Sequence, residues 1–139
     1  MKTPVVYKCS LADVEDFTEL AKEHWESFQN KKPNFDINLL SNFHVVRATD
    51  DNKTIGYILY ILYKSFYYDE VCCQVDMFYL KPEYRKQGIG KKMFTLVEED
   101  AKQQGATQLI SSFNLKQPLE GFYQKMGFEK THVAVAKEI

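Results

Sequence analysis

The sequence has few of the residues that mark special classes of protein. Its 139 residues include only six glycines, four prolines and one tryptophan, which excludes a collagen-like or low-complexity chain. Three cysteines make an odd count, and the adjacent Cys72 and Cys73 would point to opposite faces of a strand, so a disulfide framework is not expected. This favours a reducing compartment, and we expect a cytoplasmic protein.

Long apolar runs and an excess of charge are also lacking. The longest nearly apolar run, Ile55 to Tyr63, is far too short to span a bilayer, and no signal-like apolar segment follows Met1. Eighteen basic residues against nineteen acidic ones give a net charge of −1, so no overall field would attract DNA, RNA or an anionic membrane. We therefore expect a soluble protein without nucleic-acid or membrane partners, in which any phosphate-binding site is local.

The sequence does contain enough apolar surface for one core. Hydrophobic residues make up 45% of the chain and aromatic residues 14%. A chain of this length buries roughly 70% of the surface that its unfolded form exposes. Because no linker, repeat or low-complexity tract interrupts the sequence, we predict a single domain over residues 1–139.

Hydrophobic periodicity predicts a mixed order of strands and helices. Helical spacing of apolar residues runs along 11–28, follows Asp36, continues from Met93 to Gly105, and returns at 118–126. In the segment 55–63 both alternating sets are apolar, which predicts a central strand covered on both faces. The order β-α-α-β-β-β-α-β-α-β predicts a mixed α/β (α+β) domain, whose strands lie at 5–7, 44–48, 54–66, 71–80, 107–113 and 128–136.

The most informative segment is Arg85–Lys91, which joins the fourth strand to the next helix. Gly88 and Gly90 lack side chains, so successive backbone N–H groups can face an anion, and the helix N-terminus adds about half a positive charge. With the basic side chains of the same segment, such a loop suits a pyrophosphate. A Rossmann loop needs glycine where Met93 stands, and the Gly-Lys-Ser/Thr of a Walker loop is absent. On these residues alone, a simple glycine turn before a helix is the alternative.

Two segments together resemble the GNAT superfamily of N-acetyltransferases. Phe78–Gly90 is similar to that family's fourth-strand and pyrophosphate-loop signature, whose Arg/Gln-x-x-Gly-x-Gly/Ala motif is matched by Arg85, Gly88 and Gly90. Gly121–Phe128 is similar to the late Phe/Leu-Tyr-x-x-x-Gly-Phe motif. The resemblance covers essentially the whole chain and implies a GNAT-like fold, with a central, mixed and mostly antiparallel sheet flanked by helices.

The resemblance also implies acetyl-CoA as the acetyl donor, with its pantetheine arm between the fourth and fifth strands. Tyr123 would be the general acid, because a departing CoA thiolate needs a proton and a phenol with a pKa of about 10 stays protonated at neutral pH. An N–H of the fourth strand could stabilise the developing oxyanion. The backbones of Phe78, Tyr79 and Leu80 would contact the pantetheine and acetyl group. The loop would hold the pyrophosphate through Arg85, Lys86, Gln87, Gly88, Ile89, Gly90 and Lys91.

The sequence departs from the family pattern at two positions. Lys116 stands where many members have Asn, and Asn114, two residues earlier, is our candidate cofactor contact in its place. Gln74 occupies the position of a catalytic Glu in the histone-acetylating branch, and an amide cannot act as a base. We assign the base to Asp76, acting directly or through water. Alternation along the strand predicts that Gln74 and Asp76 share the face of Phe78 and Leu80. The alternative is a polar residue bonded to neighbouring backbone.

Other chemistry-bearing residues fit structural roles. The three histidines lie at no metal-ligand spacing, so we predict no metal site. Cys72 and Cys73 have apolar surroundings, which favours packing over nucleophilic catalysis. By the resemblance, five aromatic residues are candidates for the acceptor cleft, with core packing as the alternative: Trp25, Phe28, Phe66, Tyr67 and Tyr68.

We predict an acetyl-CoA-dependent N-acetyltransferase that moves the acetyl group directly to a primary amine of a small molecule, an amino acid or a protein. The alternative is a non-catalytic acyl-CoA-binding module with the same fold, used for sensing or recruitment. An enzyme acting on aminoacyl-tRNA would need a basic face, and the net charge argues against it. The acceptor, and the choice between monomer and homodimer, stay open.

Overall fold

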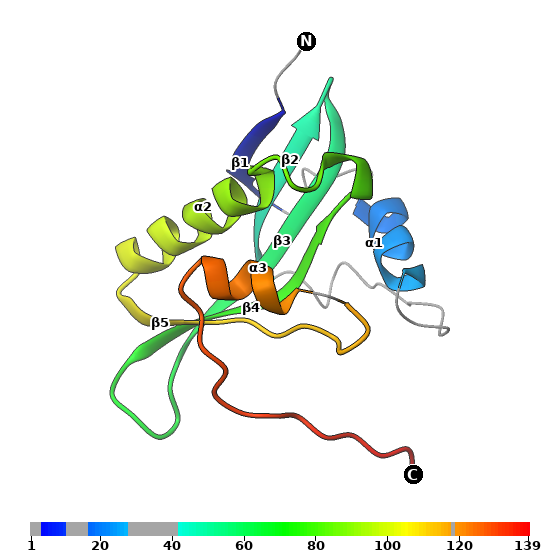
Figure 1. Ribbon diagram of the computed structural model, residues 1–139. Helices are drawn as coiled ribbons and strands as arrows, with labels where there is room; N and C mark the ends of the chain where they lie inside the picture. The colour runs from blue at the N-terminus through cyan, green and yellow to red at the C-terminus, as the bar shows by residue number, and fades with distance from the viewer. Residues whose placement is uncertain (1–3, 11–16, 28–41, 118) are drawn as a thin grey trace.

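A computed structural model describes residues 4–10, 17–27, 42–117 and 119–139 (Figure 1). Five strands form one sheet in the order β1-β2-β3-β4-β5; the first four are antiparallel to their neighbours, and β5 runs parallel to β4. This confirms the predicted mixed, mostly antiparallel sheet flanked by helices. The bounds are β1 (Val5–Cys9), α1 (Phe17–Glu26), β2 (His44–Asp50), β3 (Lys53–Lys64), β4 (Val71–Leu80), the 3₁₀ turn η3 (Pro82–Tyr84), α2 (Ile89–Gln103), β5 (Ala106–Ile110) and α3 (Glu120–Lys125).

Helices cover both faces of the sheet, with α2 and α3 on one face and α1 on the other (Figure 1). One core lies under α2 and includes Ile58 and Tyr60, while the other lies under α1 and includes Tyr57 and Leu59. These four residues alternate along β3, so this strand contributes to both cores, as the two apolar parities predict. No helix in the described part of the chain is long and apolar enough to cross a bilayer.

A β-bulge interrupts β4 at Asp76. Leu59 of β3 pairs with Met77, but the next residue, Tyr60, pairs with Val75, so Asp76 is the extra residue between them. A bulge adds one residue to one strand and therefore reverses which face the following side chains occupy.

The bulge makes one prediction wrong. Val75 and Phe78 pack in the α2-side core, whereas Met77 packs under α1, so strict alternation does not run through the strand. Gln74 therefore lies on the face opposite to Phe78 and Leu80 rather than sharing theirs. The sequence shows strand propensity here, but it contains no signal for the extra residue.

The predicted strand at 128–136 is also wrong for this chain alone. Phe128 is half-buried, but residues 129–139 are all exposed and have no regular secondary structure. The alternation is present, but no neighbouring strand in the described part of the chain supplies hydrogen bonds to it. Of the helical pattern over 11–28, α1 is the described part; the short helix predicted after Asp36 lies outside the described residues.

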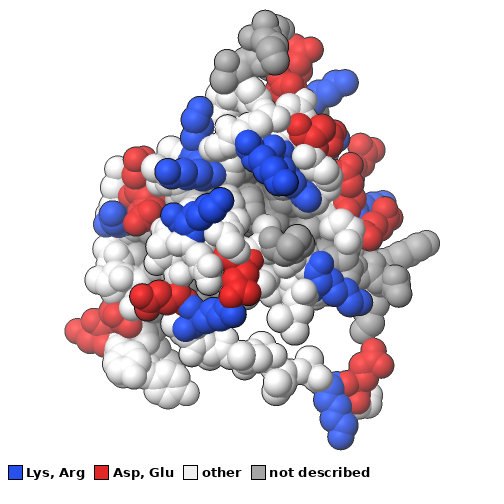
Figure 2. Space-filling view, viewed as in Figure 1, with Lys and Arg blue, Asp and Glu red and all other residues white. Residues whose placement is uncertain are grey.

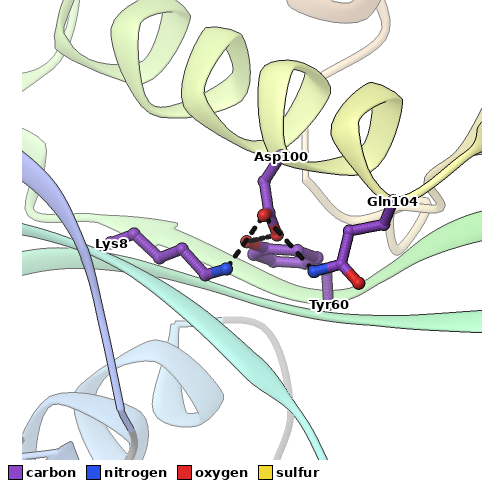
Figure 3. A network of polar contacts seen from close by, with 4 residues as sticks. All are labelled: Lys8, Tyr60, Asp100 and Gln104. Carbon is purple, nitrogen blue, oxygen red and sulfur yellow. Dashed lines mark hydrogen bonds and ion pairs between the residues drawn. The ribbon is translucent and has the colours of Figure 1, made fainter.

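A polar network fixes α2 on the sheet (Figure 3). Asp100 of α2 accepts hydrogen bonds from Lys8 of β1 at 2.9 Å, from Tyr60 of β3 at 2.7 Å and from Gln104 at 3.4 Å. Burial would raise the pKa of Asp100, but the hydrogen bonds from Lys8, Tyr60 and Gln104 outweigh it and hold that pKa below its usual 3.8. The network therefore anchors the C-terminal half of α2 to β1 and β3.

Candidate active site

The two parallel strands separate beyond Gln74, which opens one edge of β4. β5 pairs with β4 only from Val71 to Gln74, while β3 pairs with the other edge as far as Leu80. Among the described residues, no strand lies beside the β5-facing edge from Val75 to Leu80. A strand edge of this kind presents backbone N–H and C=O groups that an extended ligand can use.

The loop after β4 ends in a set of backbone N–H groups at the start of α2. Gly88 is the N-cap with a φ of 82°, no side chain caps the helix, and Lys86 also has a positive φ of 62°. The first hydrogen bond within the helix runs from the N–H of Lys92 to the carbonyl of Gly88. The N–H groups of residues 89–91 therefore have no acceptor within the helix. A Cβ on Gly88 would meet nothing within 4 Å, so its conformation, and not packing, requires glycine.

Gly90 is required for a different reason, because it brings the two sequence motifs into contact. A Cβ at Gly90 would lie 3.1 Å from the Cζ of Phe122 and 3.3 Å from the Cζ of Phe78. These two rings stack with their centroids 5.5 Å apart, and both pack against Phe94 of α2. The end of β4, the glycine loop and α3 therefore form one packed unit.

Basic side chains lie around this loop. Figure 2 shows Lys and Arg side chains gathered over α2 and the loop before it, and the side chains of Lys86 and Lys91 are exposed. Arg85 is engaged within the protein: its Nε donates to the carbonyl of Leu80 at 2.8 Å, and its guanidinium lies 5.5 Å from the ring centre of Tyr79. Arg85 thus braces the loop against β4, and a contact with pyrophosphate stays a prediction.

Several other predicted contacts would use backbone atoms only. Gln87 donates its side-chain amide to the carbonyl of Glu83 at 3.1 Å, and Ile89 packs its side chain in the α2-side core. Tyr79 and Leu80 are buried on opposite faces of β4. Their main-chain groups along the open edge are what the structure offers a ligand.

Tyr123 lies beside the point where β4 and β5 separate. Its side chain is 5% exposed, its ring stacks on Phe113, and its hydroxyl accepts a hydrogen bond of 2.8 Å from Ser111, the residue that follows β5. Burial raises the pKa of Tyr123, and the bond from Ser111 only partly opposes this. The phenol is therefore protonated at neutral pH, as a general acid must be. Sequence reasoning missed Ser111, whose only signal is a hydroxyl directly after a strand.

Asp76 and Asn114 differ in whether their side chains already make hydrogen bonds within the protein. Asp76 is exposed at the bulge, burial of part of its carboxyl raises its pKa, and its carboxylate has no hydrogen bond among the described residues. This does not favour the alternative of a side chain bonded to nearby backbone. Asn114 accepts a hydrogen bond at its Oδ1 from the N–H of Lys116 at 2.9 Å, so it shapes the turn, and its contact with a cofactor stays a prediction.

A second polar cluster ties α1 to the sheet on the opposite face. The Nδ1 of His24 lies 2.6 Å from the hydroxyl oxygen of Tyr57, and the His24 ring stacks on the ring of Tyr79. The hydroxyl of Tyr79 donates a hydrogen bond to the carboxylate of Glu23 at 2.8 Å. Burial, and secondarily the charge of Arg85, lowers the pKa of His24 to about 4. His24 is a neutral residue of the interior, as its place on the helix face predicts.

The remaining candidates have structural surroundings. Cys73 belongs to the α2-side core, and burial together with the charge of Asp100 raises the pKa of its thiol to about 11, which disfavours a nucleophilic thiolate. Among the described residues, no group of three or more histidine, cysteine or acidic side chains is placed to hold a metal ion.

The aromatic candidates for the acceptor cleft divide into two groups. Trp25 is half-buried against the α1-side core, and Phe28 lies outside the described residues. The other three are exposed at the tip of the β3–β4 hairpin, so core packing is wrong for Phe66, Tyr67 and Tyr68.

Comparison with known proteins identifies the family. A model of the acetyltransferase (GNAT) family matches residues 13–128, most of the chain. The chain belongs to the GNAT family of acetyltransferases. This confirms the resemblance seen in the two motifs and makes the protein an acyltransferase. None of the curated proteins compared with this acetyltransferase matches it significantly.

Solved structures share the fold at low sequence identity. A putative acetyl transferase from Pyrococcus furiosus has a TM-score of 0.82 and 17% identity, covering 99% of this chain and 100% of its own. A ribosomal-protein-alanine N-acetyltransferase from Brucella melitensis has a TM-score of 0.80 and 15% identity, covering 99% of both chains. An aminoglycoside N-acetyltransferase solved in complex with CoA has a TM-score of 0.78 and 14% identity, covering 99% of this chain and 95% of its own.

Proposed function

We propose that this acetyltransferase moves an acetyl group from acetyl-CoA directly to a primary amine at the point where β4 and β5 separate. The observation that carries the proposal is the continuity of the open edge of β4 with the N-terminus of α2. An extended pantetheine on Val75–Leu80 would lead to a pyrophosphate at Gly88, where unpaired N–H groups and the helix dipole favour negative charge. Tyr123 stands at the other end of that path.

Acetyl-CoA supplies the acetyl group as a thioester, and the chain supplies position and proton transfer. An N–H on the open edge of β4 stabilises the negative charge that develops on the acetyl oxygen as the amine nitrogen bonds to the carbonyl carbon. Tyr123 donates its hydroxyl proton to the sulfur as the carbon–sulfur bond breaks. Ser111 orients that hydroxyl through the bond of 2.8 Å.

Asp76 is the proposed acceptor of the amine proton, directly or through one water. Its raised pKa brings the carboxylate closer to working pH, and its place at the bulge puts it at the start of the open edge. Replacing it should matter less as the pH rises, because the free amine then deprotonates without help. The pH profile of kcat/KM for Asp76→Asn tests this: a constant deficit at all pH values contradicts the role.

The acceptor is tested by a screen with acetyl-CoA that follows release of free thiol, with mass spectrometry of the products. Aminoglycosides and alanine-bearing peptides form the first panel, since acetyltransferases of the same fold are named for aminoglycosides and for ribosomal-protein alanine, and free amino acids are added as a third class of primary amine. We expect thiol release that depends on one of these amines, and a product heavier by one acetyl group. Tyr123→Phe serves as the matched blank.

The alternative, a non-catalytic acyl-CoA-binding module, predicts a different experimental result. It predicts that acetyl-CoA binds and raises the melting temperature while no amine is acetylated. The protonated, oriented hydroxyl of Tyr123 favours the enzyme, because a binding module has no need of a proton donor beside the thioester.

A further inference from the structure

One carboxylate ties α1 to the end of β4. Glu23 of α1 accepts a hydrogen bond of 2.8 Å from the hydroxyl of Tyr79, and its other oxygen lies 3.9 Å from the Nζ of Lys81. These two partners stand on either side of Leu80, the last residue of β4. A hydrogen bond to a charged acceptor is strong, whereas a long ion pair between partly exposed side chains is worth little. Glu23 therefore holds the end of β4 mainly through Tyr79.

The loop after β4 is fixed to the same residues. The guanidinium of Arg85 lies 5.5 Å from the ring centre of Tyr79, and its Nε donates to the carbonyl of Leu80 at 2.8 Å. The ring of Tyr79 also stacks on His24 of α1, with the ring centroids 4.8 Å apart. The contacts of α1 and those of the loop thus meet on Tyr79.

Tyr79 stands where the two parts of the proposed CoA site join. It belongs to the open edge of β4 on which the pantetheine is proposed to lie, and Arg85 begins the segment proposed to hold the pyrophosphate. A ligand that spans both parts binds best when both are already in place, because less ordering then opposes binding. α1 covers the face of the sheet opposite to α2 (Figure 1), so Glu23 would act on the ligand only through Tyr79.

We propose that Glu23 is a positioning residue for acetyl-CoA. Its hydrogen bond to Tyr79 fixes the end of β4 and the following loop in the arrangement that binds the ligand. The inference rests on the proposed function, which places acetyl-CoA on β4 and the loop. Coupling between two sites is reciprocal, so bound acetyl-CoA in turn restrains α1, the helix that carries the acceptor-cleft candidate Trp25.

The charge of Glu23 separates this role from simple electrostatics. CoA is an anion, so removing a negative charge from its surroundings would strengthen binding, or leave it unchanged, if charge alone acted. Loss of a positioning contact weakens binding instead, so Glu23→Ala distinguishes the two by the sign of its effect. Glu19→Ala removes the same charge from an exposed position in the first turn of the same helix, and is the matched control.

The test is calorimetric titration of the full chain with CoA. We expect Glu23→Ala and Tyr79→Phe each to weaken binding by about 3- to 30-fold, and the double variant to be no weaker than either, because both remove one contact. Glu23→Gln keeps an oxygen that can accept from Tyr79 and loses only the charge beside Lys81, so it should bind CoA nearly as the wild type does. Tyr57→Phe also removes a tyrosine hydroxyl that contacts α1, at His24, and should lower the melting temperature while CoA affinity stays the same.

Hydrogen exchange supplies a second readout, which a merely structural contact would not change. Saturating CoA should slow the exchange of the α1 amides in the wild type, and should do so much less in Tyr79→Phe. Unchanged affinity in Glu23→Ala, additive losses in the double variant, an equal loss in Tyr57→Phe, or α1 exchange that ignores CoA in the wild type would each overturn the proposal. A wild type that binds no CoA contradicts the proposed function itself, whereas these outcomes in a chain that binds CoA contradict only the role of Glu23.

Discussion

Gly88 and Gly105 stand at the two ends of α2 in nearly the same backbone conformation, and only Gly88 lies at the proposed pyrophosphate site. Their φ angles are 82° and 87°, and a Cβ at either position would meet no atom within 4 Å. An L-residue in the left-handed region costs about 1–2 kcal/mol. At about 2–4 °C per kcal/mol for a chain of this size, alanine at either position should lower the melting temperature by roughly 2–8 °C.

The two variants should differ only when CoA is added. A ligand at 100 times its Kd stabilises the native state by about 2.7 kcal/mol, which corresponds to roughly 5–11 °C here. Gly105→Ala should keep this shift. In Gly88→Ala the methyl group lies beside the N–H groups of residues 89–91, and we expect the affinity to fall at least tenfold, a loss of about 1.4 kcal/mol and so of roughly 3–6 °C.

Thermal denaturation and calorimetric titration measure both effects in the same samples. Desulfo-CoA should behave as CoA does, because the contact is with phosphates and not with sulfur. Equal CoA affinity in Gly88→Ala and Gly105→Ala would remove the loop from the binding site, whatever the stability of the two variants.

The half-buried Asp100 and the buried His24 predict the response of stability to pH, measured by urea denaturation. The folded-state pKa of Asp100 lies below 3.8, so its contribution to the free energy of unfolding is complete above about pH 4 and is lost as the pH falls through the folded-state pKa. Asp100→Asn should lower the free energy of unfolding by about 1–3 kcal/mol at neutral pH. Asp69→Asn, at an exposed position, should change it very little. His24 is neutral in the folded state down to about pH 4 but binds a proton near 6.5 when unfolded, so stability should fall between these values as the pH falls, by roughly 3 kcal/mol at 1.36 kcal/mol per unit. His24→Gln should remove that slope and the exposed His132→Gln should keep it; an unchanged slope in His24→Gln would contradict the assignment.

Periodicity predicts most of the fold because the long strand β3 and the helices α1 and α2 bury regular sets of side chains. β3 is the clearest case, since apolar residues in both parities require cover on both faces, and it lies in the middle of the sheet. The bulge at Asp76 could not be predicted, because one extra residue only shifts which of the following side chains face each side of the sheet, and residues on both faces of β4 are apolar. The strand predicted at 128–136 is absent for another reason: a strand pattern fixes which residues alternate, but not whether a partner strand is present.

The site divides along the same lines. Gly88 and Tyr123 could be named from the sequence because both match motifs of the family. The structure gives Gly88 a left-handed N-cap and Tyr123 a hydrogen-bonded hydroxyl, and their roles in binding and catalysis stay predictions. Ser111 could not be found, since its role depends on the meeting of β5 with α3 across twelve residues. Arg85 shows the limit of motif reading: the motif position is matched, but the side chain braces Leu80 and Tyr79.

The rate of acetyl transfer by Tyr123→Phe tests the central claim most directly. The change keeps the ring packed against Phe113 and removes only the hydroxyl, so acetyl-CoA binding should stay nearly intact. Tyr60→Phe is the matched control, because it also removes a bonded tyrosine hydroxyl, but one that bonds to Asp100 at 2.7 Å. With the identified acceptor, we predict that Tyr123→Phe lowers kcat and kcat/KM together by about 10²-fold or more and that Tyr60→Phe turns over nearly as the wild type does. Turnover of Tyr123→Phe at the wild-type rate would contradict the assignment and return Tyr123 to a packing role.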